Sequence, residues 1–260
     1  RGVEMILPLG DDNTDRRITP YVTWTFIAIN ILVFVFGQGL GSNIEFTYAL
    51  STVPEEIVTG QDLVTQGEIV RDPAGGAQQR RPGLQPTPIS VYITLITSMF
   101  MHGGLAHILG NMLFLFIFGD NIEDRLGHKR FIAFYLLVGI IASLAHVFTT
   151  AAMDGNMQVP SLGASGAISG VLGGYLLLFP KKRVTVLFLR ILMQVPAIVA
   201  IGIWFLFQLL NGMGALGSQT GGVAYAAHIG GFIAGLLLIH AFDQGPPRAK
   251  RSARTTRRRR

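Results

Sequence analysis

Four polar side chains lie inside stretches of the sequence that are otherwise apolar, and together they could catalyse acyl transfer. They are His107, Asn111, Ser165 and His228. A serine hydroxyl attacks a carbonyl carbon when a histidine within hydrogen-bond distance takes its proton during the attack. Ser165 and His228 therefore have the chemistry of a nucleophile and its general base.

The remaining two residues could stabilise the negative charge that develops on the carbonyl oxygen. His107 and Asn111 are four residues apart, so on a helix they share one face, one turn from each other. Each hydrogen-bond donor aimed at such an oxyanion is worth about 2.7–4 kcal/mol of transition-state stabilisation. The two side chains, with the backbone N–H of Ser165, could supply these donors.

An acidic third residue usually orients the histidine of such a site, and the sequence offers none at the same place. All Asp and Glu residues fall outside the predicted apolar spans, and a carboxylate at membrane depth costs about 2.5–3.5 kcal/mol. A Ser-His dyad fits this inventory. The sequence contains no cysteine, and His102 with His107 has no acidic or thiolate neighbour, so we predict neither a metal site nor a cofactor.

Ser165 has competitors as the nucleophile. Considered alone, it would be interpreted as a packing serine whose hydroxyl bonds a carbonyl one turn back. Ser161 and Ser169 share its helical face at four-residue spacing. We favour Ser165 because Gly163 and Gly166 flank it, whereas Ser161 is expected in a loop and Ser169 one turn deeper.

The composition indicates a membrane protein. Of 260 residues, 50% are hydrophobic and 14% are charged, whereas soluble domains carry nearer a quarter of charged residues. A span of about 20 apolar residues crosses the hydrocarbon layer. Six such spans are predicted, at about 20–40, 98–119, 131–150, 162–179, 192–213 and 221–242. We therefore predict an all-α, polytopic bundle of six transmembrane helices.

The positions of lysine and arginine predict the orientation. Basic residues lie before the first span, after the second and fourth, and in the tail 244–260, whereas 151–161 and 212–220 contain none. The positive-inside rule then places both termini in the cytoplasm. We expect a cytoplasmic segment 1–19, a six-span domain 20–243 with a long external loop at about 41–90, and a basic cytoplasmic tail. This tail is expected to act as an orientation signal or to contact anionic lipids, rather than to bind nucleic acid.

This topology brings the polar residues together. The second, fourth and sixth spans all run from outside to inside, so His107, Ser165 and His228 are expected at similar depth in the outer leaflet. Glycines 163, 166, 170 and 174 in the fourth span, and 231 and 235 in the sixth, form faces that let helices approach closely. We expect this approach to bring the Ser165 hydroxyl to the His228 ring.

The combination of HILGN at 107–111, GASG at 163–166 and AHIGG at 227–231, on spans two, four and six, resembles the rhomboid family of intramembrane serine proteases. The resemblance extends over about 20–242. It implies a bacterial-type endopeptidase in the plasma membrane that cuts in or near the transmembrane helices of single-span or other membrane proteins, with its site open to the outside. It matches Ser165 to the nucleophile, His228 to the base, and His107 and Asn111 to the oxyanion site.

The resemblance also implies that the region of the fifth helix, at about 194–222, gates substrate entry. Many members have an aromatic residue four positions after the nucleophile that packs against the catalytic histidine. Here that position is Ser169, so another residue must hold His228.

Two other functions remain open from the sequence. One is a non-catalytic, rhomboid-like protein that binds membrane helices, although such proteins normally lack the serine or histidine that is present here. The other is a small transporter, for which polar residues would line a path through the bilayer. The inner halves of spans two, four and six are nearly devoid of polar residues, which disfavours a transporter.

Overall fold

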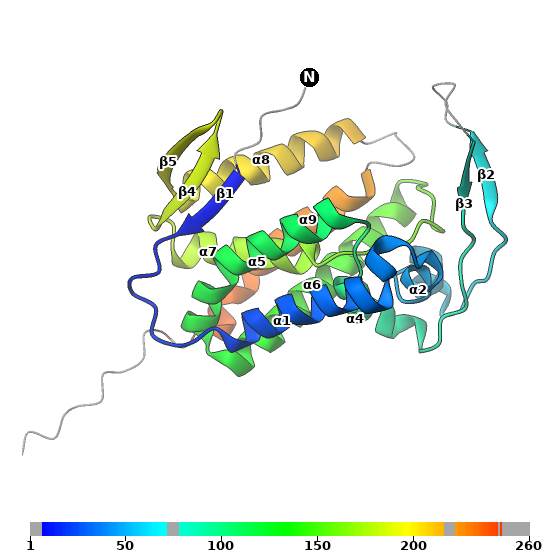
Figure 1. Cartoon of the computed structure of the whole chain (residues 1–260), viewed down its shortest axis with the longest axis horizontal. Helices are drawn as coiled ribbons and strands as arrows, with labels where there is room; N and C mark the ends of the chain where they lie inside the picture. The colour runs from blue at the N-terminus through cyan, green and yellow to red at the C-terminus, as the bar shows by residue number, and fades with distance from the viewer. Residues whose placement is uncertain (1–6, 72–77, 216–221, 244, 246–260) are drawn as a thin grey trace, which may run out of the picture.

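The structure of the protein is a computed structural model that describes residues 7–71, 78–215, 222–243 and 245. The chain folds as a helical bundle with a small sheet at either end (Figure 1). The main helices are α1 Tyr21–Leu32, continued as a π-helix over Val33–Gly37, α5 Leu105–Leu126, α6 His128–Ala152, α7 Ser165–Leu178, α8 Ala197–Ala215 and α9 Gly222–Phe242. Shorter helices are α2 Ile44–Ala49, α3 Pro54–Thr59 and α4 Thr94–Thr97, and 3₁₀ turns span Gly39–Gly41, Val91–Ile93 and Ser98–Phe100. The strands are β1 Leu7–Asp11, β2 Glu68–Arg71, β3 Gln78–Arg81, β4 Arg183–Phe188 and β5 Ile191–Pro196.

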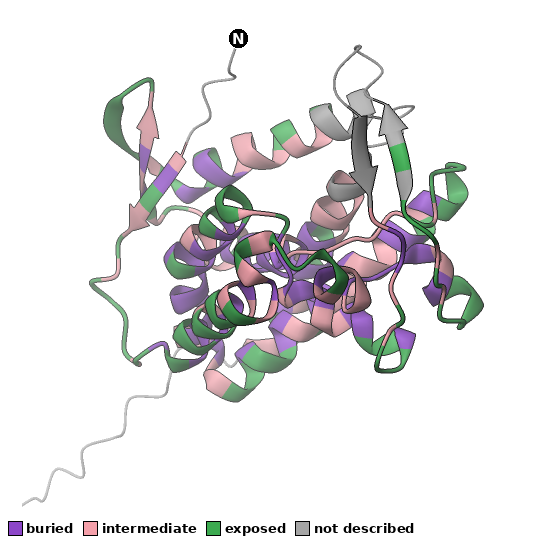
Figure 2. Ribbon diagram, turned by 45° about the vertical axis from the view of Figure 1, so that its right-hand side comes forward, coloured by how far each residue is buried: buried purple, intermediate pink, exposed green. Residues whose placement is uncertain are grey.

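The bundle has the character of a multi-pass membrane domain. Leu105–Leu126, His128–Ala152 and Tyr225–Phe242 are long and apolar enough to cross a membrane, and among the described residues Tyr21–Gly37, Val91–Phe100, Ser165–Leu178 and Ala197–Leu210 are shorter apolar helices. Buried residues follow the surfaces where helices meet (Figure 2). Outward-facing positions are also apolar, as with Leu237, which is 75% exposed. Lipid is the solvent that suits such a surface, and the predicted all-α membrane bundle is confirmed.

Each predicted span corresponds to one helix, but several bounds were wrong. The second span was expected from 98, yet α5 begins at Leu105 because the chain turns into extended backbone at Met101. The fifth was expected from 192, yet Ile191–Pro196 forms β5 and α8 begins only after Pro196. A short apolar run has the same composition in a strand and in a helix, so its periodicity does not distinguish them.

The acidic residues expected in loops or at span ends include two buried ones that lie in the last two turns of α5, because this helix extends beyond the predicted end at 119. This helix continues to Leu126 and contains Asp120 and Glu123, which are 3% and 0% exposed. Glu123 accepts hydrogen bonds from the backbone N–H groups of Val22 and Thr23, at 2.9 and 2.7 Å. Those N–H groups lack partners within the first turn of α1, so the carboxylate at the end of α5 caps α1.

Helices α7 and α9 approach until their backbones touch. A Cβ added at Gly231 would lie 2.1 Å from the carbonyl oxygen of Gly166, and one at Gly235 would lie 2.0 Å from that of Gly170. No side chain fits at these distances, so the small residues are a steric requirement of the packing. Both helices are thereby fixed in register next to Ser165 and His228.

A three-stranded antiparallel sheet, in the order β1-β4-β5, covers one end of the bundle. Asp11 of β1 connects this sheet to α7 and α5. Its Oδ2 accepts hydrogen bonds from the Tyr175 hydroxyl at 2.6 Å and from Asn121 Nδ2 at 2.7 Å. The Lys182 ammonium, which precedes β4, donates to Asn121 Oδ1 and to Asp15 at 2.7 Å. The hairpin that leads into α8 is therefore attached to α5, α7 and the N-terminal segment.

Stability is expected to fall as pH rises through the titration of Asp11. Burial raises the pKa of this carboxyl from 3.8 to about 6. Because the folded state favours the neutral form, its contribution to the free energy of unfolding, about 3 kcal/mol, is complete below about pH 4 and lost as pH passes 6. Asp11→Asn is neutral at every pH. Its unfolding temperature in detergent, relative to the wild type, should rise between pH 5 and pH 8; identical pH profiles would contradict this assignment.

The connection expected as an external loop at about 41–90 is more ordered than predicted. It contains α2, α3 and the β2–β3 hairpin, at the opposite end of the bundle from the β1-β4-β5 sheet (Figure 1). Within this connection, Glu68–Arg71 pairs antiparallel with Gln78–Arg81. Residues 72–77 and most of the basic tail 244–260 lie outside the described part of the chain.

Candidate active site

The segment that precedes Ser165 is fixed by backbone pairing. Ser161 and Thr52 exchange hydrogen bonds of 2.8 and 3.0 Å, and the N–H of Gly163 donates to the Ser98 carbonyl at 2.8 Å. Gly163 has a φ of +122°, which side-chain-bearing residues rarely adopt. The chain turns here so that Ser165 becomes the first residue of α7.

The side chains of Ser165 and His228 meet between α7 and α9. Ser165 Oγ lies 2.8 Å from His228 Nε2, and both side chains are partly buried. The distance is within the range for a hydroxyl that donates to an imidazole nitrogen. The sequence expectation that these two residues come together therefore agrees with the geometry.

His107 borders the same space, and its protonation is set by its neighbours. Its Nδ1 accepts the backbone N–H of Gly103 at 3.2 Å, so the neutral ring carries its proton on Nε2. A Cβ at residue 163 would lie 2.9 Å from this Nε2 and 3.6 Å from Ser165 Oγ. Glycine at 163 thus leaves open a point between the serine hydroxyl and the donating edge of His107.

Asn111 lies one turn further along α5. Its side chain is 8% exposed, and its Nδ2 has no hydrogen-bond partner in the described part of the chain. A buried amide donor without a partner costs about 1–3 kcal/mol, and such groups occur where a ligand or intermediate satisfies them. Asn111 is not among the residues that line the cavity next to Ser165, so the structure brings three of the four predicted residues to one cavity.

That cavity has a volume of about 200 Å³. Small side chains and glycines form much of its wall around the serine. Its lining includes Met99, His107, Gly139, Ala142, Pro160, Gly163, Ser165, Ala167 and His228. A peptide carbonyl could enter this space, whereas bulky groups would meet the crowded helix faces.

The other polar residues that the sequence brought into question have different surroundings. Ser161 lies in the segment before α7, and Ser169 is fully buried with its hydroxyl bonded to the Ser165 carbonyl at 2.6 Å. The packing role considered for Ser165 thus belongs to Ser169. His102 is 1% exposed, its ring centroid lies 5.1 Å from that of His107, and its ring nitrogens have no hydrogen-bond partner in the described part of the chain.

One residue of the site was missed from the sequence. Gln208 of α8 places its Oε1 2.9 Å from Nδ1 of His228, on the far side of the ring from Ser165. The available signal was a single amide inside the apolar run WFLFQLL at 204–210. A polar side chain inside an apolar span costs free energy, so this glutamine was a candidate functional residue for the same reason as the histidines.

Comparison with known proteins identifies the family. A model of the Rhomboid domain matches residues 90–243, more than half of the chain. The chain belongs to the rhomboid family. The resemblance found in the sequence motifs is thereby confirmed, and the matched residues contain His107, Asn111, Ser165, Gln208 and His228.

This rhomboid is similar to several relatives over part of their length. It is 34% identical over 156 residues to Rhomboid protein 1, mitochondrial, of Saccharomyces cerevisiae, covering 59% of this chain and 43% of the relative. It is 30% identical over 217 residues to Rhomboid protease GluP of Bacillus subtilis, covering 81% and 35%. It is 30% identical over 178 residues to human Presenilin-associated rhomboid-like protein, mitochondrial, covering 62% and 43%. The chain spans less than half the length of these relatives.

Proposed function

We propose that this rhomboid is an intramembrane serine endopeptidase that uses a Ser165–His228 dyad to hydrolyse peptide bonds in or near the transmembrane helices of membrane proteins. The observation that carries the proposal is the 2.8 Å separation of Ser165 Oγ and His228 Nε2 at the wall of a cavity inside a helical membrane bundle. Family membership and a relative named as a protease support the same class of activity.

The first step transfers an acyl group to the enzyme. Ser165 Oγ attacks the carbonyl carbon of the scissile bond while its proton passes to Nε2 of His228. The resulting imidazolium then protonates the leaving amine, and the C–N bond breaks. In the second step water attacks the acyl ester, His228 takes a proton from the water, and Ser165 leaves with that proton as its hydroxyl is restored.

The oxyanion formed in both steps needs donors. His107 Nε2–H is supported for this role because its other nitrogen already accepts from Gly103. The Ser165 N–H is supported because the first N–H groups of a helix have no partner within it, and the positive end of the helix dipole favours an anion. The unpartnered Nδ2 of Asn111 supports it as a third donor.

Asn111→Ala is expected to lower kcat about 10²-fold or more, with KM nearly unchanged, because the donor acts mainly on the charge of the transition state. Steady-state cleavage of a single-span substrate in liposomes measures both constants. Leu109→Ala is the matched control, since Leu109 is on the same helix and is 61% exposed. An unchanged kcat in Asn111→Ala would remove this residue from the oxyanion site.

The substrate class follows from the site. The carbonyl groups of a helix are bonded within the helix, so a transmembrane substrate must unwind near the cut before Ser165 can reach a carbonyl. We propose substrates with easily unwound helices and a small residue before the cut, in keeping with the family pattern. The proposed reaction uses no cofactor and no metal.

The topology completes the proposal. We propose that both termini and the β1-β4-β5 sheet face the cytoplasm, because Lys181, Lys182, Arg183 and Arg190 gather there. The site then opens to the external side. We extend the rhomboid domain over 20–243, with the cytoplasmic segment 1–19 and the basic tail 244–260 beside it. We propose a bacterial plasma membrane, for which the relative from Bacillus subtilis is the support; the yeast and human relatives are named mitochondrial.

The function is tested with a panel of single-span proteins in liposomes. Cleavage that depends on Ser165, with product masses that place the cut in or beside the transmembrane helix, is the expected result. Binding of these substrates without cleavage would instead assign a non-catalytic helix-binding role. Transport of a solute with no effect of Ser165→Ala would overturn the protease assignment.

A further inference from the structure

Helix α8 reaches the ring that acts as the proposed base. The two nitrogens of His228 have different partners: Ser165 Oγ is 2.8 Å from Nε2, and Gln208 Oε1 is 2.9 Å from Nδ1. A neutral imidazole carries one proton, on one nitrogen or the other. An amide oxygen can only accept, so it requires the proton on Nδ1. The lone pair is then on Nε2, where a base must have it to take the Ser165 proton.

We infer that Gln208 is a positioning residue for the dyad, holding His228 in the Nδ1–H tautomer and in the orientation that faces Ser165. This inference rests on the proposed protease function. The hydrogen bond from His228 to Gln208 would hold the imidazole ring in place, in a chain that has Ser169 at the position where an aromatic residue was expected. Ser169 instead bonds the backbone of its own helix.

An amide suits this position physically. A carboxylate in the same place would orient the ring more strongly, but an ionised group within the bilayer costs about 2.5–3.5 kcal/mol. Glutamine accepts the Nδ1 proton without carrying charge. The glutamine also lies on a helix whose other side chains are apolar in the described region Ala197–Leu210.

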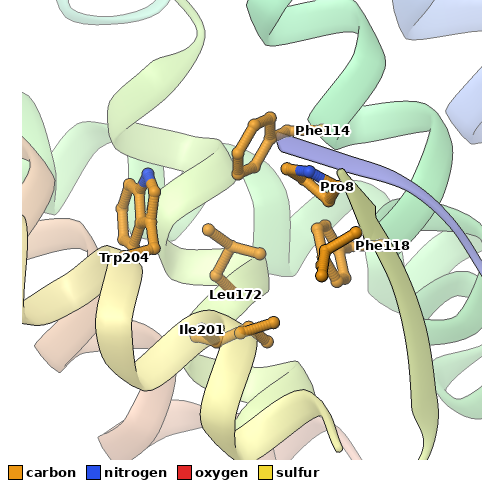
Figure 3. Close-up of a pocket in the computed structure, with 8 residues that line it drawn as sticks. Pro8, Phe114, Phe118, Leu172, Ile201 and Trp204 are labelled. Atoms are coloured by element: carbon orange, nitrogen blue, oxygen red, sulfur yellow. The ribbon is translucent and has the colours of Figure 1, made fainter. Parts of the chain in front are cut away.

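The position of Gln208 depends on how α8 packs against the bundle. Trp204, one turn earlier on α8, has its ring centroid 6.3 Å from that of His228, and Phe205 stacks on Phe232 of α9 at 4.1 Å. Figure 3 shows Trp204 beside an apolar pocket that Phe114 of α5 and Leu172 of α7 also line. Because these contacts seat α8, they also place the acceptor for His228, so withdrawal of α8 would remove it.

The test compares two substitutions of similar size at one position. Gln208→Leu removes the acceptor, and we expect kcat to fall about 10- to 100-fold with KM within about twofold, as for loss of an interaction that matters after binding. Gln208→Glu restores an acceptor and should return kcat to within about fivefold of the wild type. Leu206→Ala, on the exposed side of the same helix, should retain the wild-type kcat.

A second measurement reads the tautomer without requiring catalysis. Nitrogen NMR of ¹⁵N-histidine-labelled protein in micelles, with His228→Ala used to assign the signal, should show Nδ1 protonated in the wild type at neutral pH. In Gln208→Leu the signal should shift towards the Nε2–H form or a mixture. A merely structural role for Gln208 would leave the tautomer unchanged.

The outcomes separate the two proposals. Wild-type kcat in Gln208→Leu, or an Nε2–H tautomer in the wild type, would overturn the role of Gln208 while Ser165-dependent cleavage stands. Absence of Ser165-dependent cleavage in the wild type would overturn the protease function. In that case the tautomer measurement still decides whether Gln208 positions the ring.

Discussion

Ser165→Ala is expected to abolish cleavage of a transmembrane substrate, lowering kcat at least about 10⁴-fold, because the alcohol that forms the acyl intermediate is gone. The hydroxyl is small and the residue begins α7 without a side-chain cap of its own. Its removal should therefore leave the unfolding temperature nearly unchanged. Product formation in liposomes and labelling by a fluorophosphonate probe measure the effect independently.

The chain offers a matched control in Ser169→Ala. Ser169 is one turn deeper on the same helix and its hydroxyl is bonded to the Ser165 carbonyl, so the substitution removes an equal group that has no part in the proposed reaction. Cleavage and labelling should persist in this variant. His228→Ala should lose both, because Ser165 then has no base at 2.8 Å.

Cleavage at the wild-type rate in Ser165→Ala would contradict the dyad mechanism. Labelling that survives in Ser165→Ala but disappears in Ser169→Ala would move the nucleophile one turn down the helix. Labelling of both single variants would indicate a serine elsewhere in the cavity wall, where Ser98, Ser143 and Ser161 are the remaining candidates.

The sequence was sufficient to predict the parts of the site that follow from helix geometry and topology. His107, Ser165 and His228 occupy three apolar segments that run in the same direction, and a polar group in such a segment is costly enough to require a reason. Depth along a helix follows from the rise per residue. The helical bundle and the convergence of these three residues on one cavity could therefore be expected before any coordinates.

Features that depend on how neighbouring helices pack were not accessible in this way. Gln208 lies 20 positions before His228 on a separate helix, and only the packing of α8 against α9 brings them together. Strand β5 was missed because its apolar residues fit equally well as the start of the predicted fifth span. The buried Glu123 was missed because its partners in α1, the backbone N–H groups of Val22 and Thr23 and the Thr23 hydroxyl, lie about a hundred positions earlier in the chain.

Gly231→Val is expected to abolish the proposed cleavage and to lower the unfolding temperature of the protein. The Cβ alone would sit 2.1 Å from the Gly166 carbonyl oxygen and 3.2 Å from Ala142 Cβ. Backbone atoms cannot rotate away as a flexible side chain can, so α7 and α9 must separate. Overpacking of this kind costs about 1–3 kcal/mol or more. The same displacement carries Ser165 away from His228.

Gly202→Val is the matched control for this substitution. Gly202 is also inside an apolar helix, but a Cβ added there meets no atom within 4 Å, so the variant tests valine in a membrane helix without a collision. It should retain cleavage and probe labelling, whereas Gly231→Val should lose both even where circular dichroism still shows a helical protein. Full activity in Gly231→Val would mean that the dyad tolerates a wider separation of its helices. The hydrogen bond of 2.8 Å would then not be what makes Ser165 reactive, because a gap opened by about one methyl group exceeds the reach of a direct proton transfer.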